Sequence, residues 1–130
     1  MANLATDGPV GFNHRRTYRA QTAALARGTV VKQGTADDQA VIAGANDRVL
    51  GIVGETTVNV GDATEVVMFG ECPAIAGAAV NAGDIVKSDA NGNLIAGNAA
   101  DVETGGKAIT SASGAGDLFI VFVQPIHKRS

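Results

Sequence analysis

The chain has no tryptophan, a single cysteine and few aromatic residues of any kind. Aromatics make up 4% of the 130 residues, which argues against a ligand pocket lined by large rings. One cysteine, Cys72, cannot form an intrachain disulfide framework. We interpret Cys72 as a small buried hydrophobe in a protein made in a reducing cytosol.

Long apolar runs are missing as well. No run approaches the ~18 residues that a membrane-spanning helix needs, and the first residues lack the basic-then-apolar pattern of a secretion signal, so no membrane partner is expected. The chain instead has 45% hydrophobic residues, mostly alanine, valine and isoleucine, and 17 glycines. This composition favours one globular domain of short elements joined by tight turns.

Charge is distributed unevenly along the chain. Residues 1–27 carry a net charge of +3, residues 28–126 carry −8, and the tail after Ile126 carries +2. An acidic body with basic ends indicates contact with a partner through the ends. A solvated basic terminus without a partner is the alternative interpretation.

The sequence repeats itself at a shift of 55 residues. This shift places Gly61-Asp62 on Gly116-Asp117 and Val31-Lys32 on Val86-Lys87. We therefore predict an internal duplication with halves 17–71 and 72–126, in which the two Gly-Asp turns precede equivalent strands. Asn91-Gly92 predicts a two-residue hairpin turn in the second half.

Short runs rich in valine, isoleucine, threonine and phenylalanine recur between the turns, and none keeps a helical period for 10–12 residues. The predicted strands are 29–31, 40–43, 48–58 and 64–70 in the first half, and 84–86, 94–96, 107–113 and 118–125 in the second. The predicted fold is all-β, a compact β-barrel or β-sandwich built from two similar units of about 55 residues with an extended N-terminal arm.

The larger side chains of these runs supply the predicted core. Its members are Leu50, Ile52, Val66, Met68, Phe69, Ile85, Leu118, Ile120 and Phe122. The run 118–125 does not alternate between apolar and polar residues. We expect this strand to be covered on both faces, or one of its faces to meet a second subunit.

Motifs for catalysis or ligand binding are weak. Residues 89–93 resemble the start of a calcium loop, but the glycine is misplaced and Ala100 stands where a bidentate glutamate is needed. The glycines at 105–106 and 114–116 lack the rest of a phosphate or dinucleotide motif. His14 and His127 lie in the polar ends without closely spaced partners. We predict no catalytic, metal or cofactor site, and no enzyme activity.

Three stretches carry a family resemblance: "ALARGTVVKQG", "NDRVLGIVGETTVNVGDATEVVMFGE" and "AGDIVKSDANGNLIAG". Together they resemble bacteriophage head-decoration, or capsid cement, proteins over about residues 17–124. The resemblance implies a β-rich module that binds the outer surface of the major capsid protein lattice and stabilises the head. It also implies self-assembly, with a trimer favoured and a dimer possible, and a place on the virion after synthesis in the host cytoplasm.

The basic N-terminal segment is the predicted binding element. We divide the chain into an extended arm of residues 1–16, a domain of residues 17–126 and a basic tail of residues 127–130. Aromatic and arginine side chains dominate interface hot spots, so the predicted capsid- or neighbour-binding anchors are Phe12, Arg15, Arg16, Tyr18 and Arg19. The alternative is a small β-barrel that binds nucleic acid or a small ligand. The acidic body disfavours the nucleic-acid alternative, because it would repel phosphates.

Overall fold

The computed structural model describes residues 13–57, 59–98, 101 and 103–127, and these residues form strands without any helix. The all-β prediction is therefore confirmed. The strands are β1 (His14–Ala20), β2 (Val30–Gln33), β3 (Gln39–Ile42), β4 (Gly51–Val53), β5 (Ala63–Ile75), β6 (Ile85–Ser88), β7 (Leu94–Ala96), β8 (Glu103–Ala108) and β9 (Leu118–His127).

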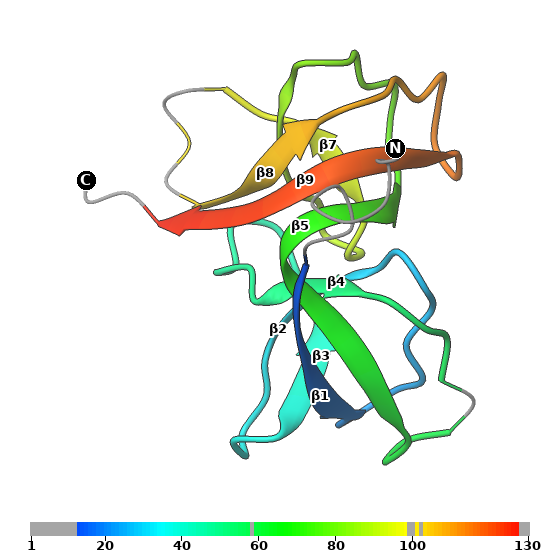
Figure 1. The fold of residues 1–130 in the computed structure, drawn as a ribbon, viewed down its shortest axis with the longest axis vertical. Helices are drawn as coiled ribbons and strands as arrows, with labels where there is room; N and C mark the ends of the chain where they lie inside the picture. Colours follow the sequence, from blue (N-terminus) through cyan, green and yellow to red (C-terminus); the bar gives the residue numbers. More distant parts are fainter. Residues whose placement is uncertain (1–12, 58, 99–100, 102, 128–130) are drawn as a thin grey trace, which may run out of the picture.

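The first five strands close into a barrel. They are hydrogen-bonded in the order β1-β3-β2-β4-β5, and β5 pairs with β1 to complete the ring. The remaining strands continue from β5 in the order β9-β8-β6-β7. A parallel bridge between Ala76 and Leu94 brings β7 back beside the chain that leaves β5. The result is two stacked β units that share one strand (Figure 1).

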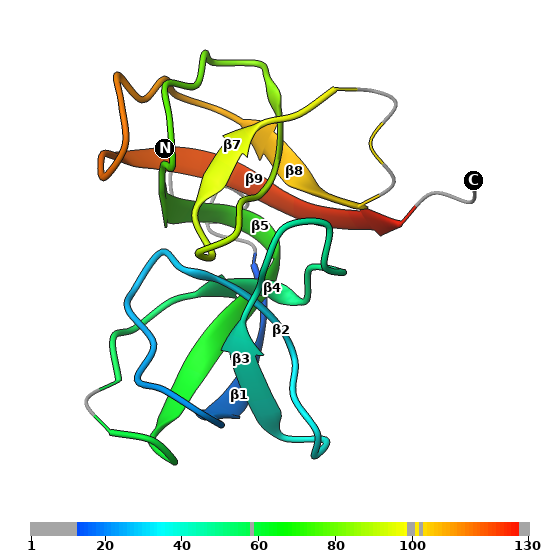
Figure 2. The ribbon, with the colours of Figure 1, turned by 180° about the vertical axis from the view of Figure 1, so that it is seen from behind.

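The shared strand β5 belongs to both units because it is long and strongly curved. Its first half pairs with β1 and β4, and its second half pairs with β9. Gly70 lies between the halves at a φ of 114°, a conformation that side chains rarely adopt. The green ribbon in Figures 1 and 2 passes from the lower unit to the upper unit at this part of the strand.

The two units repeat the same strand register 55 residues apart. Val30 pairs with Ile52 in the first unit, and Ile85 pairs with Lys107 in the second. On the next strand pair, Ile52 faces Val67 and Lys107 faces Phe122, again at a shift of 55. This agreement confirms that the fold contains two similar β units.

The two Gly-Asp turns are equivalent in their backbone geometry. Gly61 and Gly116 have φ angles of 91° and 90°. Their N–H groups donate 2.8 Å hydrogen bonds to the carbonyls of Ala20 and Ala76, respectively. In the second turn the Asp117 carboxylate accepts hydrogen bonds from the hydroxyl and the backbone N–H of Ser113, which lower the pKa of Asp117. Each turn thus fixes the start of the last strand of its unit.

The predicted hairpin at Asn91-Gly92 exists, but its turn is longer than two residues. Strands β6 and β7 are joined by residues 89–93, and the Asp89 carboxylate accepts N–H bonds from Asn91 and Asn93. Gly92 has a positive φ of 77°. Its carbonyl accepts a 2.8 Å hydrogen bond from the N–H of Val30, so the hairpin tip contacts the first unit.

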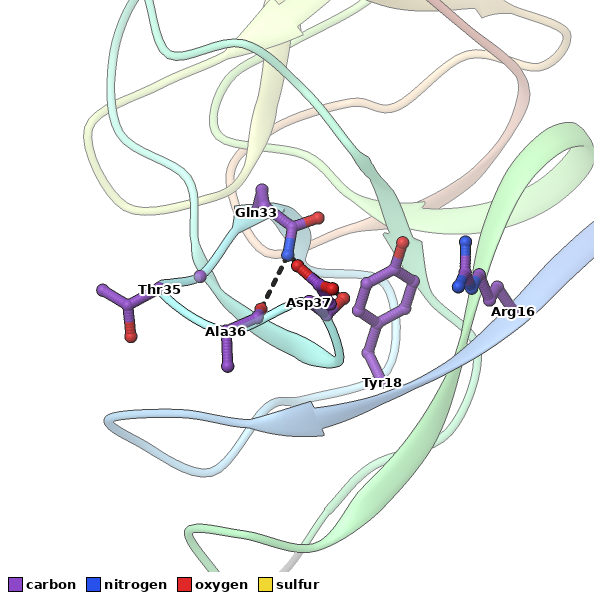
Figure 3. Close-up of a pocket in the computed structure, with 7 residues that line it drawn as sticks. Arg16, Tyr18, Gln33, Thr35, Ala36 and Asp37 are labelled. Atoms are coloured by element: carbon purple, nitrogen blue, oxygen red, sulfur yellow. Dashed lines mark hydrogen bonds between the residues drawn. The ribbon is translucent and has the colours of Figure 1, made fainter.

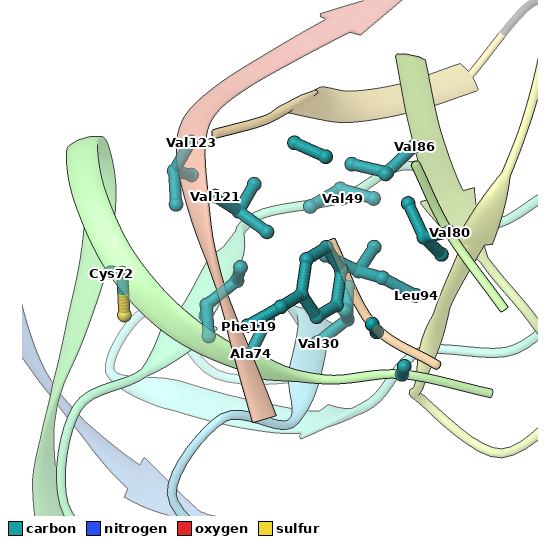
Figure 4. Packing of buried hydrophobic residues seen from close by; sticks show 14 of the residues in the cluster. Val30, Val49, Cys72, Ala74, Val80, Val86, Leu94, Phe119, Val121 and Val123 are labelled. Atoms are coloured by element: carbon teal, nitrogen blue, oxygen red, sulfur yellow. The ribbon is translucent and has the colours of Figure 1, made fainter. Parts of the chain in front are cut away.

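Two clusters of buried side chains fill the units. The smaller cluster lies inside the first barrel and contains Tyr18, Ala20, Leu25, Val31, Ala40, Val53 and Val66. The larger cluster fills the second unit, where Phe119 and Leu94 lie among valines and alanines (Figure 4). It also takes in Val30, Ile52 and Val67 from the first unit. The units therefore share a continuous core instead of meeting at a polar boundary.

The predicted core was mostly right in the first unit but was on the wrong side of the strands in the second. Ile52 and Val66 are fully buried, but Phe69, Ile85 and Leu118 are 39%, 36% and 60% exposed. In β9 the buried side chains are Phe119, Val121 and Val123, which alternate with the predicted ones. Because this strand is apolar in both alternating positions, its sequence does not reveal which set points inward.

Domain boundaries also differ from the prediction. Residues 14–16 lie in β1 and pair with β5, so the sheet includes the last residues of the predicted arm. Strand β9 extends to His127, the first residue of the predicted tail. Phe12 and the rest of residues 1–12, with residues 128–130, lie outside the described residues. The third predicted strand of the second half, 107–113, is observed at Glu103–Ala108.

Replacement of Gly106 should destabilise the fold more than replacement of Gly116. Both residues have positive φ, 137° and 90°, so either alanine variant is strained. A Cβ at position 106 would also collide with the carbonyl oxygen of Phe122, whereas a Cβ at 116 meets nothing within 4 Å. We expect G106A to lower the free energy of unfolding by about 3 kcal/mol and G116A by about 1 kcal/mol, measured by urea denaturation. Equal losses would contradict the close approach of β8 and β9 at Gly106.

Candidate functional site

Strand β1 carries three exposed arginines on the first barrel. Strand β1 pairs antiparallel with β5 from His14 to Arg19, and this pairing fixes the arginines on a rigid strand. We call the exposed arginines of this strand, Arg15, Arg16 and Arg19, the basic strand surface, and they point to both sides of the strand. All three are exposed, whereas Tyr18 between them is buried.

Two of these arginines are held by carboxylates of the same molecule. The Arg15 Nη1 atom lies 3.2 Å from Glu65 Oε1, and the Arg19 Nε atom lies 3.6 Å from Asp38 Oδ2. Arg19 also donates a 3.1 Å hydrogen bond to the carbonyl of Gly61. The side chains of both pairs are more than 40% exposed, so each pair contributes at most about 1 kcal/mol to stability. A partner's carboxylates could replace these contacts at little cost.

Arg16 forms no ion pair with any residue that the structure describes. Its guanidinium carbon lies 6.0 Å from the centre of the Tyr18 ring, at the outer limit of a cation–π contact. Figure 3 shows both side chains at one side of an open hollow whose other side is the turn from Gln33 to Asp37. Arg16 is therefore the arginine of this surface most available to an acidic partner.

Tyr18 is not positioned to act as a surface anchor. Its side chain is 3% exposed and belongs to the core of the first barrel. The alternation of β1 explains this position, because Tyr18 and Ala20 share the inward side while Thr17 and Arg19 point outward. Of the predicted anchors, Arg15 and Arg19 therefore share the outward side of β1, whereas Arg16 lies on the side of Tyr18.

A fourth arginine extends the basic strand surface and was not among the predicted anchors. Arg27 lines an open hollow with Arg15, Glu55 and Thr56. Its backbone N–H donates a 3.0 Å hydrogen bond to the Thr56 hydroxyl, which holds this segment against the loop after β4. Its charge was visible in the sequence, but its position at the same hollow as Arg15 depends on the barrel.

A second exposed surface lies on the other unit and is apolar. The outward side chains of β9 lie beside those of β5, and the rings of Phe69 and Phe122 meet edge to face at 5.0 Å. Ile85 on β6 and the segment after β8 complete the surface. We call the following residues the outer apolar face: Phe69, Pro73, Ile75, Ile85, Ile109, Leu118, Ile120, Phe122 and Ile126.

Chemical features of the interior are few. Within the described residues, no group of three or more histidine, cysteine, aspartate or glutamate side chains could hold a metal ion. Cys72 is buried, as predicted, and burial raises the pKa of its thiol to about 11. The thiol is therefore protonated, and a poor nucleophile, at neutral pH. No helix of the described residues could cross a bilayer.

Comparison with known protein families identifies the family of this chain. The model of the family described as phage cement protein matches residues 12–124, nearly the whole described region. The chain belongs to the phage cement protein family. The resemblance noted in the sequence is thus confirmed, and with it a structural role associated with the phage capsid. No curated protein matches the sequence significantly.

A solved structure supports the fold of this cement protein family member. The N base of head fiber gp8.5 of bacteriophage phi29 is similar to it, with a TM-score of 0.66 and 20% sequence identity. The similarity covers 92% of this chain and 100% of the phage phi29 chain. At this identity the similarity shows a common fold and does not transfer individual binding residues.

Proposed function

We propose that this chain binds the outer surface of the major capsid protein lattice and reinforces the phage head. The family match over residues 12–124 is the observation that carries the proposal. The protein's work is then mechanical, without catalysis, a cofactor or a membrane. It is made in the host cytoplasm and acts on the virion, with copies of itself as a second partner in a trimer or a dimer.

The architecture suits such a role because it is rigid and presents surfaces instead of a deep pocket. The two units share one strand and one buried cluster, which resists bending between them. The basic strand surface offers exposed arginines on a body whose residues 28–126 carry −8. Long-range attraction to an acidic capsid patch would speed encounter, and many copies on a symmetric lattice would multiply weak contacts.

Nucleic-acid binding is the less supported alternative. The body outside the basic strand surface is acidic and would repel a continuous phosphate backbone. We therefore assign the basic strand surface to a protein partner.

Charge reversal at Arg16 tests the capsid contact. We expect R16E to weaken cosedimentation with undecorated capsids at least tenfold, because an interface arginine is replaced by a repelling charge. R48E is the matched control, because Arg48 is exposed on the β3–β4 connection and the change in net charge is the same. The measurement is the apparent Kd at low and at moderate salt.

Two outcomes would contradict parts of this proposal. Equal binding of R16E, R48E and the unaltered chain would remove Arg16 from the capsid contact. Failure of the unaltered chain to bind capsids of its own phage at any salt concentration would overturn the capsid-binding function itself.

A further inference from the structure

In the first unit, both sides of the sheet β2-β4-β5 are covered. Val31, Val53 and Val66 point into the barrel. Val30, Ile52 and Val67 point to the other side, yet they are at most 1% exposed, because the second unit packs on them. This outer side of the first sheet is thus an interface between two β units of one chain.

Within the described residues, the equivalent side of the second unit has no such cover. At a shift of 55 residues, Ile85, Lys107 and Phe122 occupy the positions of Val30, Ile52 and Val67, with the same cross-strand pairs. Ile85 is 36% exposed, Lys107 is exposed and Phe122 is half-buried. The fold therefore repeats an interface surface and leaves the second copy of that surface open.

Side chains on this open surface are more apolar than at equivalent exposed positions of the first unit. Leu118 and Ile120 stand where the first unit has Ala63 and Glu65. Leu118 is 60% exposed. Scattered apolar residues are normal on a protein surface, but a contiguous patch across neighbouring strands marks a contact surface. The outer apolar face has that form.

Two charges on this surface have opposite sign and flank its central aromatic. Phe122 lies between Glu71 on β5 and Lys107 on β8, its direct cross-strand partners. Both charged residues are exposed. Two copies related by a twofold axis can place Glu71 of each copy against Lys107 of the other. The surface is thus complementary to itself in charge as well as apolar.

We propose that the outer apolar face binds a second copy of this chain. The second copy would cover the side of the second unit whose equivalent in the first unit is already covered within the chain. This inference deepens the self-association part of the proposed function and does not depend on capsid binding. In a twofold interface this face packs against the same face of the other copy, with Phe122 and Leu118 at its centre and the Glu71–Lys107 pairs at its sides.

Self-association of the full chain tests the apolar part. We expect the unaltered chain to associate reversibly at concentrations on the order of 1 to 100 µM, the range in which weak dimers form. Sedimentation velocity measures this association. L118E should raise the Kd of association at least tenfold. V60E is the matched control, because Val60 is a similarly exposed apolar residue, 56% against 60%, on the turn before β5. Thermal melting should show that both variants stay folded.

Charge exchange identifies the second copy as the occupant. E71K and K107E should each weaken association, because each places like charges together. An equimolar mixture of the two variants, and the double variant E71K/K107E, should associate as the unaltered chain does. Restoration of association by a second substitution in the same protein is expected only if the partner is another copy of this chain.

The inference fails if the unaltered chain is monomeric throughout this range, or if L118E associates as V60E does. It also fails if the charge-exchanged mixture shows no rescue. Loss of capsid binding by L118E with self-association intact would assign the face to the capsid instead. That result would overturn this inference and leave the proposed function standing.

Discussion

Replacement of Ile52 by lysine is expected to remove most of the stability of the protein. Ile52 is 1% exposed and packs against the core of the second unit. The variant loses the packing of a buried isoleucine and places an ammonium group in an apolar contact without a described carboxylate partner. Together these effects should lower the free energy of unfolding by at least about 4 kcal/mol, out of the 5–15 kcal/mol typical of domains.

The second repeat provides the control for this substitution. Lys107 occupies the position of Ile52 at a shift of 55 residues, on the exposed side of β8. We expect K107I to change the free energy of unfolding by no more than about 0.5 kcal/mol, since surface substitutions seldom have larger effects. Urea denaturation of both variants gives the comparison. If I52K and K107I were equally mild, the first unit would not pack on the second through this side.

Truncation of Tyr18 is the second large expected effect. The ring is 3% exposed and is the largest side chain in the core of the first barrel. Y18A should therefore cost about 3–5 kcal/mol, as other buried aromatic truncations do, because a cavity remains. Y18F keeps the ring and should cost far less. Thermal melting and urea denaturation measure both.

This comparison separates a core role for Tyr18 from a role as a binding anchor. If Tyr18 is a core residue, Y18A should lose much of its stability, and Y18F should bind capsids almost normally. R16A, on the same strand, should leave stability almost unchanged, because Arg16 is exposed. A Y18A variant as stable as the unaltered chain would show that the first barrel does not depend on this ring.

The duplication and the all-β class could be predicted from the sequence because both depend on local signals. Glycine-bounded runs of β-branched residues have a short period, and Gly-Asp turns need a positive φ that few residues supply. The sequence alone therefore marks Gly61 and Gly116 as equivalent turns. The family resemblance followed from the same ordered turns and strands, and it predicted the capsid-associated role.

The composition of the ends also predicted the location of the basic surface, though not its form. Four arginines before residue 28 were visible as an excess of charge. The placement of three of them in β1, paired along β5, depends on a contact some 50 residues away in sequence. An isolated segment rich in arginine gives no sign of such a partner. The boundary after residue 16 was misplaced for this reason.

Only the tertiary structure decided which side of each strand is buried. Leu118 and Phe119 are neighbours of similar hydrophobicity, but one is 60% exposed and the other 2%. The sequence predicted a strand at residues 118–125, since local preference and turns suffice for that. Which side faces the core depends on the register with β5 and β8, and a shift of one residue would exchange the sides. Ile52 is covered because the second unit packs on the outer side of the first, whereas no further unit of the described chain packs on the outer side of the second, where its repeat partner Lys107 lies.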